Sequence, residues 1–172
     1  GGEGAPVAEN VVFWSDTVTT SGTLQGNEQW RGQITITGPV TVPGGRVLQL
    51  DPGTELLFAQ GASLTVRGVL VAEGTAASPI RMTPNGNFTW GGIVFNSAPS
   101  GDSTLSYVEI SGATTGISIT DSSPHIHHSW VRRNGNGIQL WGASAPLIEN
   151  CWIGNNTGSA IAYNWANPNL PA

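Results

Sequence analysis

Hydrophobic and polar residues alternate in short runs along most of this chain, and a cluster of turn-forming residues follows each run. Four of the runs are similar in sequence: GGIVF at 91–95, TGISI at 115–119, NGIQL at 136–140 and SAIAY at 159–163. Alternation with a period of two residues is typical of a half-buried β-strand. Gly or Pro interrupts the pattern repeatedly and no 3.6-residue period is sustained, so the sequence predicts strands and no helices.

The runs recur at a nearly constant spacing. The steps between their central isoleucines are 24, 21 and 23 residues, measured over Ile93, Ile117, Ile138 and Ile161. A second run repeats with an offset of 22 residues, as SSPHIHHSWV from Ser122 and as SAPLIENCWI from Ser144. A weaker copy, STLSYVEI, starts at Ser103. Each repeat of about 22 residues is therefore predicted to hold two short strands.

A coil of this length cannot bury its apolar side alone, but coils stacked at about 4.8 Å share one continuous core. The sequence therefore predicts an all-β fold, a parallel β-helix of about five or six coils over residues 31–163. Residues 1–30, with Trp14 and Trp30, fit no coil and are expected to form an N-terminal cap. Residues 164–172 are expected to fold over the other end as a C-terminal cap.

The alignment of the repeats also predicts which side chains face inward. One predicted interior column holds Leu105, Ile126 and Ile148. Cys151, the single cysteine, aligns with Ser129, so it is expected to be a buried and unreactive thiol. Asn134 and Asn156 are 22 residues apart and are expected to form a ladder of side-chain amides in a turn.

Histidines stand on the outer face of one predicted strand. His125 and His127 flank the inward Ile126, and Glu149 lies one coil beyond His127. Two imidazoles and a carboxylate are suitable metal ligands. Nothing in the sequence confirms Glu149 or another residue as the third ligand, so we expect a solvated strand face and no tight metal site.

Tryptophans occupy another outer position. Trp130 and Trp152 align on adjacent coils, and Glu109 takes the same position one coil earlier. Two indoles beside a carboxylate make a flat platform of the size of a sugar, because aromatic faces offer large amphipathic contact areas. The alternative is that a loop, the cap or a partner subunit covers these indoles.

Catalytic groups are sparse. Glu109 and Glu149 lie two coils apart, about 10 Å along the axis, which is within the range of a glycosidase pair. They belong to different positions of the coil, however, which weakens them as a pair.

Charge excludes several functions. The net charge is −5, with six Arg and no Lys, so the chain lacks the basic surface that nucleic acid or anionic lipid requires. No apolar run is long enough for a membrane span. The first residues, GGEGAP, resemble the segment after a lipidated cysteine, so we consider an N-terminal lipid anchor upstream or an arbitrary start.

The sequences of the repeats resemble those of a known family. GPVTVPGGRVLQL, LTVRGVLVAEGTAASPIRMT, WGGIVF and SSPHIHHSWVRRNGNGI are similar to the right-handed parallel β-helix repeat proteins of bacteria, the pectate-lyase-like solenoids. The resemblance covers roughly residues 35–163 and implies the fold more than the function. Members include exported surface proteins, adhesin-like proteins and polysaccharide-active enzymes.

These observations lead to one expected function and one alternative. We expect an exported, non-enzymatic module at the cell surface, in the periplasm or secreted, which binds polysaccharide or another surface protein. The glycan-binding residues would be Trp130, Trp152 and Glu109. The alternative is a small carbohydrate-active enzyme, either a polysaccharide lyase or a glycoside hydrolase, or a fragment of one. Neither function requires a cofactor.

Overall fold

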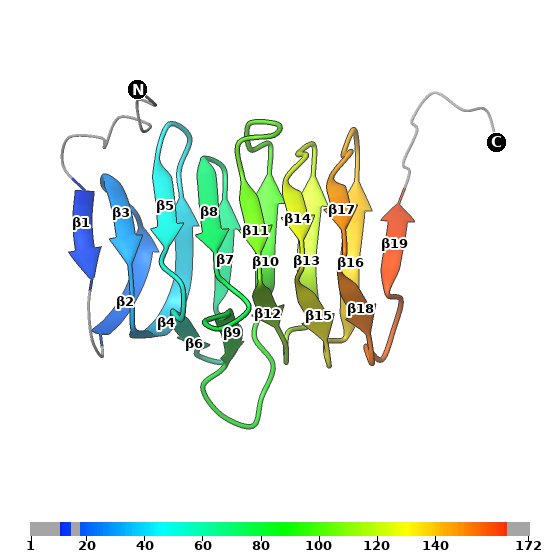
Figure 1. Ribbon diagram of the computed structural model, residues 1–172, viewed down its shortest axis with the longest axis horizontal. Coiled ribbons are helices and arrows are strands. Elements are labelled where there is room, and N and C mark those ends of the chain that lie inside the picture. Colours follow the sequence, from blue (N-terminus) through cyan, green and yellow to red (C-terminus); the bar gives the residue numbers. More distant parts are fainter. Residues whose placement is uncertain (1–10, 15–17, 165–172) are drawn as a thin grey trace.

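The computed structural model of the chain describes residues 11–14 and 18–164. These residues form β-strands joined by turns and loops, with no helix among them. Strands of successive coils lie side by side along one axis, so the fold is the predicted all-β parallel β-helix (Figure 1). In this described part, accordingly, no helix is long and apolar enough to cross a membrane.

The coils present three faces, and the first face is one continuous parallel sheet. Its strands, in order along the axis, are β1 (Val11–Trp14), β3 (Asn27–Trp30), β5 (Val47–Leu50), β8 (Val69–Glu73), β11 (Thr104–Ser106), β14 (His125–His127) and β17 (Leu147–Glu149).

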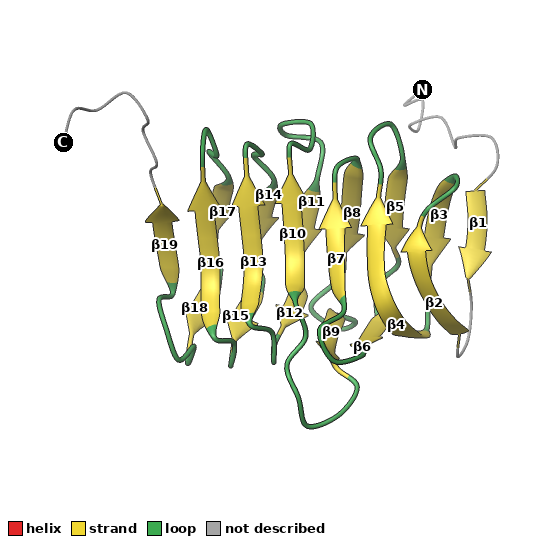
Figure 2. Ribbon diagram, turned by 180° about the vertical axis from the view of Figure 1, so that it is seen from behind, coloured by secondary structure: helices red, strands yellow, loops and turns green. Residues whose placement is uncertain are grey.

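The second and third faces are joined through the long strand β4 (Gln33–Val42), whose first half pairs with β6 and whose second half pairs with β7. The second face continues through β6 (Glu55–Phe58), β9 (Ile80–Pro84), β12 (Val108–Ile110), β15 (Trp130–Arg132) and β18 (Trp152–Gly154). The third face, seen from the front in Figure 2, continues through β7 (Ser63–Val66), β10 (Gly92–Asn96), β13 (Thr115–Thr120), β16 (Asn136–Trp141) and β19 (Ile161–Asn164).

Each coil has three strands rather than the two that the sequence pattern predicts. From β3 to β19 the chain completes six turns, and β4 serves two faces within the first of them. The run that starts at Ser122 contains both β14 and β15, because His128 between them has a left-handed backbone with φ of 51°. A single residue in this conformation turns the chain sharply without adding a visible loop to the sequence.

The N-terminal segment also differs from the expectation of a cap over residues 1–30. Within it, β1 pairs with β3, and β2 (Val18–Thr23) pairs with β4, all in parallel. β3 pairs in turn with β5, and Leu24 and Trp30 are buried in the same core as the later coils. The described part of this segment therefore extends the β-helix sheets instead of forming a separate element.

The interior columns follow the predicted register. Leu105 pairs with Ile126, which pairs with Ile148 on the next coil. The isoleucine column of the third face is also continuous, over Ile93, Ile117, Ile138 and Ile161. Stacking of like aliphatic side chains gives a core without interruption along the axis, with Phe58 stacked on Trp90 at a centroid distance of 3.9 Å.

Left-handed residues recur at the corners between faces, with φ between 46° and 70°. The first corner, between the first and second faces, uses Tyr107, His128 and Asn150; the second uses Gly112, Arg133 and Asn155; the third uses Ser97, Asp121 and Gly142. The same backbone bend thus repeats at the same point of successive coils. Asn, Asp and Gly accept this conformation most readily, which explains their frequency in the turn clusters.

Side chains at the corners carry hydrogen bonds from coil to coil. Asn134 Oδ1 accepts from the backbone nitrogen of Ala113 at 2.9 Å, and Asn134 Nδ2 donates to Asn156 Oδ1 at 3.2 Å. The predicted asparagine ladder is therefore confirmed. Ser129 Oγ acts similarly at the first corner, accepting from the backbone nitrogen of Val108 at 3.1 Å.

Cys151 takes the position of Ser129 on the next coil. Its Sγ donates to the carbonyl oxygens of Ile126 and Glu149, as Ser129 Oγ does to those of Leu105 and His127 one coil earlier. The side chain is half-buried, and this burial raises the pKa of the Cys151 thiol. A thiol in this form is a poor nucleophile, which agrees with the expected structural role.

The last described coil is less covered than the others. Ile161 is 48% exposed, whereas Ile138, its neighbour in the same column, is fully buried. The expected C-terminal cap over residues 164–172 lies outside the described residues, apart from Asn164 at the end of β19.

Truncation of the central column tests this register. Ile126→Ala is expected to destabilise the protein by about 2–5 kcal/mol, because the side chain is fully buried and its removal leaves a cavity. Ile161→Ala, at the exposed end of the neighbouring column, serves as the control and should cost much less. Chemical denaturation measures both, and equal losses would contradict the assignment of Ile126 to the core.

Removal of a ladder amide tests the corner hydrogen bonds. Asn134→Ala leaves the buried backbone nitrogen of Ala113 without its acceptor, which is expected to cost about 1–3 kcal/mol. Ser118→Ala, on the outer side of β13, is a matched control, because the Ser118 hydroxyl makes no hydrogen bond to the described residues. If both variants unfold at the same denaturant concentration as the parent, the ladder contributes no stability.

Candidate functional site

The candidate site lies on the second face, along one outward row of residues. Register pairs place Glu55, Arg81, Glu109, Trp130 and Trp152 next to one another on five successive coils. The row therefore begins with charged side chains and ends with two indoles. Because parallel pairing fixes the spacing, neighbours in this row stand about 4.8 Å apart at their backbones.

Both indoles of this row are exposed. Trp130 is 36% and Trp152 45% exposed, although tryptophan is usually far more buried. Gly154 follows on β18, and a Cβ placed there would lie 3.2 Å from Cζ2 of Trp152, so the Trp152 indole lies against the glycine backbone. Because Gly154 has no side chain, the Trp152 ring can pack directly against the backbone of its own strand. We call Trp130 and Trp152 the tryptophan platform.

An ion-pair network holds Glu109 beside the platform. Its Oε1 accepts from Arg132 Nε at 2.9 Å, and its Oε2 lies 3.7 Å from Arg81 Nε. Arg81 also contacts Glu55, with Nη1 3.5 Å from Oε1. Partly exposed pairs of this kind contribute about 0–1 kcal/mol each, so their main effect is to fix the positions of the side chains and to neutralise the carboxylate.

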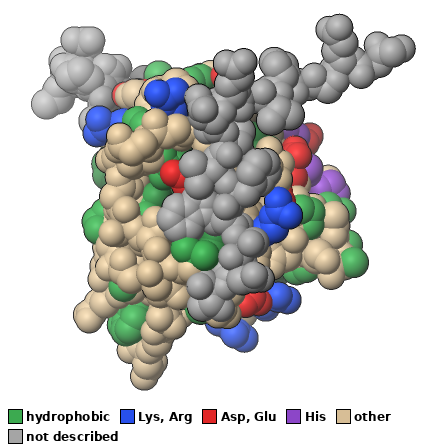
Figure 3. Space-filling view, turned by 90° about the vertical axis from the view of Figure 1, so that its left-hand side faces the viewer, with side chains coloured by type: hydrophobic (Ala, Val, Ile, Leu, Met, Phe, Trp, Pro, Cys, Tyr) green, Lys and Arg blue, Asp and Glu red, His purple; other side chains and the backbone are tan. Residues whose placement is uncertain are grey.

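The three histidines lie on the first face and at the first corner, close to one another. Figure 3, which looks at the N-terminal end, shows them together at one edge of the molecule beside acidic side chains. His125 Nε2 lies 3.0 Å from Glu149 Oε2, and the rings of His125 and His127 have centroids 4.5 Å apart. At the corner, Tyr107 stacks on His128 at 5.1 Å.

His127 and His128 share one hydrogen bond. Their Nδ1 atoms are 2.9 Å apart, so one ring donates and the other accepts. If both rings are protonated, both nitrogens are donors and the bond is lost. Partial burial lowers the pKa of His127, and the neighbouring charges of His125 and His128 lower it further, against the opposite effect of Glu149 and Glu73.

The positions of these side chains can be compared with the two kinds of chemistry that the sequence suggests, metal binding and glycoside hydrolysis. Among the described residues, no group of three or more His, Cys, Asp or Glu side chains is arranged to hold a metal ion. Glu109 and Glu149 lie on different faces, and each is engaged with a basic side chain. A pair of free carboxylates for glycoside hydrolysis is therefore not assembled by these two residues.

Several partners could not be read from the alignment of repeats. The alignment places Glu109 next to Trp130 but says nothing of the two arginines that flank the carboxylate. Arg81 belongs to an upstream coil whose spacing is irregular, because a long loop separates β9 from β10. Tyr107 lies inside STLSYVEI, the weakest copy of its repeat, and its stacking on His128 follows from the left-handed backbone that both residues share.

Comparisons with known proteins add a family but no close relative. A family model described as a right-handed β-helix region matches residues 55–170, which is more than half of the chain. The match covers all strands from β6 to β19, including those that carry the tryptophan platform and the histidines. No curated protein and no solved structure matches the chain.

The histidine cluster predicts a loss of stability on acidification. Because the folded pKa of His127 lies below the usual 6.5, the unfolded chain binds more protons, and stability falls as the pH drops below about 6.5. His127→Gln should remove this part of the pH dependence, measured as urea midpoints at about pH 7.5 and about pH 5.5.

Titration of the imidazoles by NMR provides the control for this prediction. His128→Gln should move the pKa of His127 upward, because it removes one of the charges that oppose its protonation. A titration of His127 above the usual value in the parent protein would show that the carboxylates Glu149 and Glu73 dominate instead, and would contradict the prediction.

Proposed function

Since the chain belongs to the right-handed β-helix family, and since that fold alone fixes no activity, we propose that this domain is a non-enzymatic glycan-binding module. The tryptophan platform on the second face contacts the sugar rings. The module is exported, and it acts at the cell surface, in the periplasm or after secretion.

The tryptophan platform is the observation that carries this proposal. Two large aromatic side chains occupy equivalent outward positions on adjacent coils and stay exposed. An exposed indole face is costly in water and is well suited to the apolar side of a pyranose ring. The pairing of β15 with β18 fixes the backbone positions of both tryptophans in advance, so binding orders little of the backbone.

The polar neighbours of the platform support binding to hydroxyl-rich ligands. Arg132 and Glu109 sit beside Trp130, and their mutual ion pair holds them in place. Hydroxyl groups can accept from the guanidinium and donate to the carboxylate, which gives orientation without a net charge requirement.

The same contacts argue against the alternative of a carbohydrate-active enzyme. Glu109 is paired with Arg132 and Arg81, so its carboxylate oxygens are already engaged and are not free to act on a leaving group. Glu149 is on another face and faces His125. A reducing-end assay against the glycans that bind tests this directly, because turnover would contradict a purely binding role.

Substitution of the platform tests the proposal once a glycan array has identified bound sugars. Trp130→Ala and Trp152→Ala are each expected to weaken binding about tenfold, which corresponds to about 1.4 kcal/mol and is typical of a lost aromatic stacking contact. Isothermal titration calorimetry measures the affinities.

Trp141→Ala is the matched control, because Trp141 is 39% exposed but stands at the end of β16 on the third face. It should bind as the parent does. If the array shows no bound glycan, or if Trp141→Ala weakens binding as much as the platform variants, the proposed function is wrong.

A further inference from the structure

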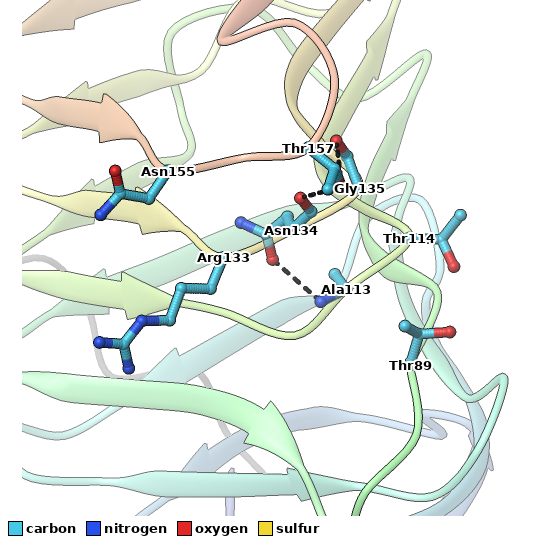
Figure 4. A pocket seen from close by; sticks show the side chains of 8 residues that line it. All are labelled: Thr89, Ala113, Thr114, Arg133, Asn134, Gly135, Asn155 and Thr157. Carbon is cyan, nitrogen blue, oxygen red and sulfur yellow. Dashed lines mark hydrogen bonds between the residues drawn. The ribbon is translucent and has the colours of Figure 1, made fainter.

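A groove runs along the second corner, next to the tryptophan platform. Figure 4 shows the side chains that line this groove, which has a volume of about 420 Å³. Arg133 and Asn155 extend toward the strands of the second face, whereas Thr89 and Thr114 lie on the opposite side. Its position at the end of β15 and β18 makes it a continuation of the surface that carries the platform.

The groove lies where one coil has a small residue and the next coil has a larger one at the same position. Gly112, Arg133 and Asn155 occupy the same corner position on successive coils, as their backbone hydrogen bonds show. The missing side chain of Gly112 does not open the groove, because a Cβ there would lie 2.6 Å from Cδ of Pro84, which fills this space. The next position is Ala113, where the following coil has Asn134. Arg133 and Asn155 line the groove on the following two coils, and both side chains are exposed.

Arg133 has no charge partner within residues 18–164. Arg132, the adjacent residue, is paired with Glu109, and Arg81 is paired with two carboxylates. The Arg133 guanidinium is exposed and takes part in no ion pair or side-chain hydrogen bond with the described residues. Arg46 and Arg67 also take part in no ion pair with the described residues, but among the residues that line the groove Arg133 is the charged one.

Asn155 adds a second free donor to the same side of the groove. Its side-chain amide makes no hydrogen bond to the rest of the described chain, although Asn134 and Asn156 in the adjacent position are fully engaged in the ladder. The left-handed backbone at Arg133 and Asn155 directs both side chains out of the ladder. The groove thus offers an unpaired guanidinium and a carboxamide one coil apart, about 4.8 Å at their backbones.

We infer that this groove binds the carboxylate group of an acidic sugar, with Arg133 as its charged partner and Asn155 as a neighbouring donor. A guanidinium matches the two oxygens of a carboxylate in a bidentate geometry, and the neighbouring Arg132 already binds a carboxylate on this face, donating from Nε and Nη2 to Oε1 of Glu109. The inference rests on the proposed function, since the platform contacts the neighbouring rings of the same glycan.

The distances along the coil fit one ligand on both sites. Trp130 and Arg133 are three residues apart, as are Trp152 and Asn155, so each platform residue is within about 10 Å of its groove residue. An oligosaccharide lying across β15 and β18 would place one ring on the indoles and a carboxylate-bearing ring over the groove. The net charge of −5 disfavours long polyanions in general, so recognition depends on this local guanidinium.

The test compares neutral, uronate-containing and sulfated oligosaccharides on one glycan array, followed by calorimetry on the best uronate ligand and its neutral counterpart of the same linkage. Wild-type protein should prefer the uronate ligand. Arg133→Gln should weaken uronate binding by about tenfold or more and change neutral binding by less than about twofold. Arg133→Lys keeps the positive charge but lacks the planar guanidinium, so its affinity for the uronate ligand should lie between those of the wild type and Arg133→Gln.

Arg67→Gln is the matched control, because Arg67 is an exposed arginine in the turn between β7 and β8 and its removal changes the net charge equally. It should leave the preference intact. Raising the salt concentration should weaken uronate binding and spare neutral binding.

The outcomes separate this inference from the proposed function. Equal binding of neutral and uronate ligands, a preference that survives in Arg133→Gln, or stronger binding of sulfated ligands would each overturn the carboxylate site while leaving the platform in place. Uronate binding that depends on Arg133 but not on Trp130 or Trp152 would support the groove and contradict the platform. Absence of any bound glycan would overturn both.

Discussion

Parallel backbone pairing between equivalent residues of successive coils is the constraint on which this structure depends. It fixes one inter-coil distance of about 4.8 Å for every position of the coil, so whatever side chain occupies a position is stacked on its equivalents. Ile117, Ile138 and their neighbours become an unbroken apolar column for this reason. The corners obey the same rule, since left-handed residues and the amides of Asn134 and Asn156 also repeat from coil to coil.

Outward-facing positions do not have to repeat the same kind of residue, and at these positions the coils differ in sequence. On the second face, Glu55, Arg81 and Glu109 neutralise one another along the axis, and the row then changes to Trp130 and Trp152. Because the backbone repeats from coil to coil, outward residues that differ between coils are still aligned in rows, and each row forms an ordered surface. The platform, the histidine cluster and the corner groove all lie on the later coils, where the sequence repeats are also most regular.

The predictable part of the fold is the part that repeats. The steps between Ile93, Ile117 and Ile138 predicted the register that the pairing shows, and the 22-residue offset predicted both the pairing of Trp130 with Trp152 and the asparagine ladder. Three strands per coil were not predicted, because the single left-handed residue at His128 leaves no turn-like sequence between β14 and β15.

Contacts between side chains of unequal coils were also beyond prediction. Arg81 reaches Glu109 from a coil with irregular spacing. Arg132 is paired with Glu109 because it still belongs to β15, whereas Arg133 follows at the corner, where the left-handed backbone directs its side chain elsewhere. Glu109 illustrates the limit, since its position was predicted correctly from the repeat while its neutralisation by two arginines follows only from the three-dimensional arrangement.

Indole NMR during a glycan titration tests the central claim most directly. The chain has seven tryptophans, and each gives one indole N–H resonance that substitution can assign. The account predicts that a bound oligosaccharide shifts the resonances of Trp130 and Trp152, leaving those of the buried Trp30 and Trp90 and of the exposed Trp141 in place. Shifts confined to Trp141, or saturable binding without any change at Trp130 and Trp152, would contradict it.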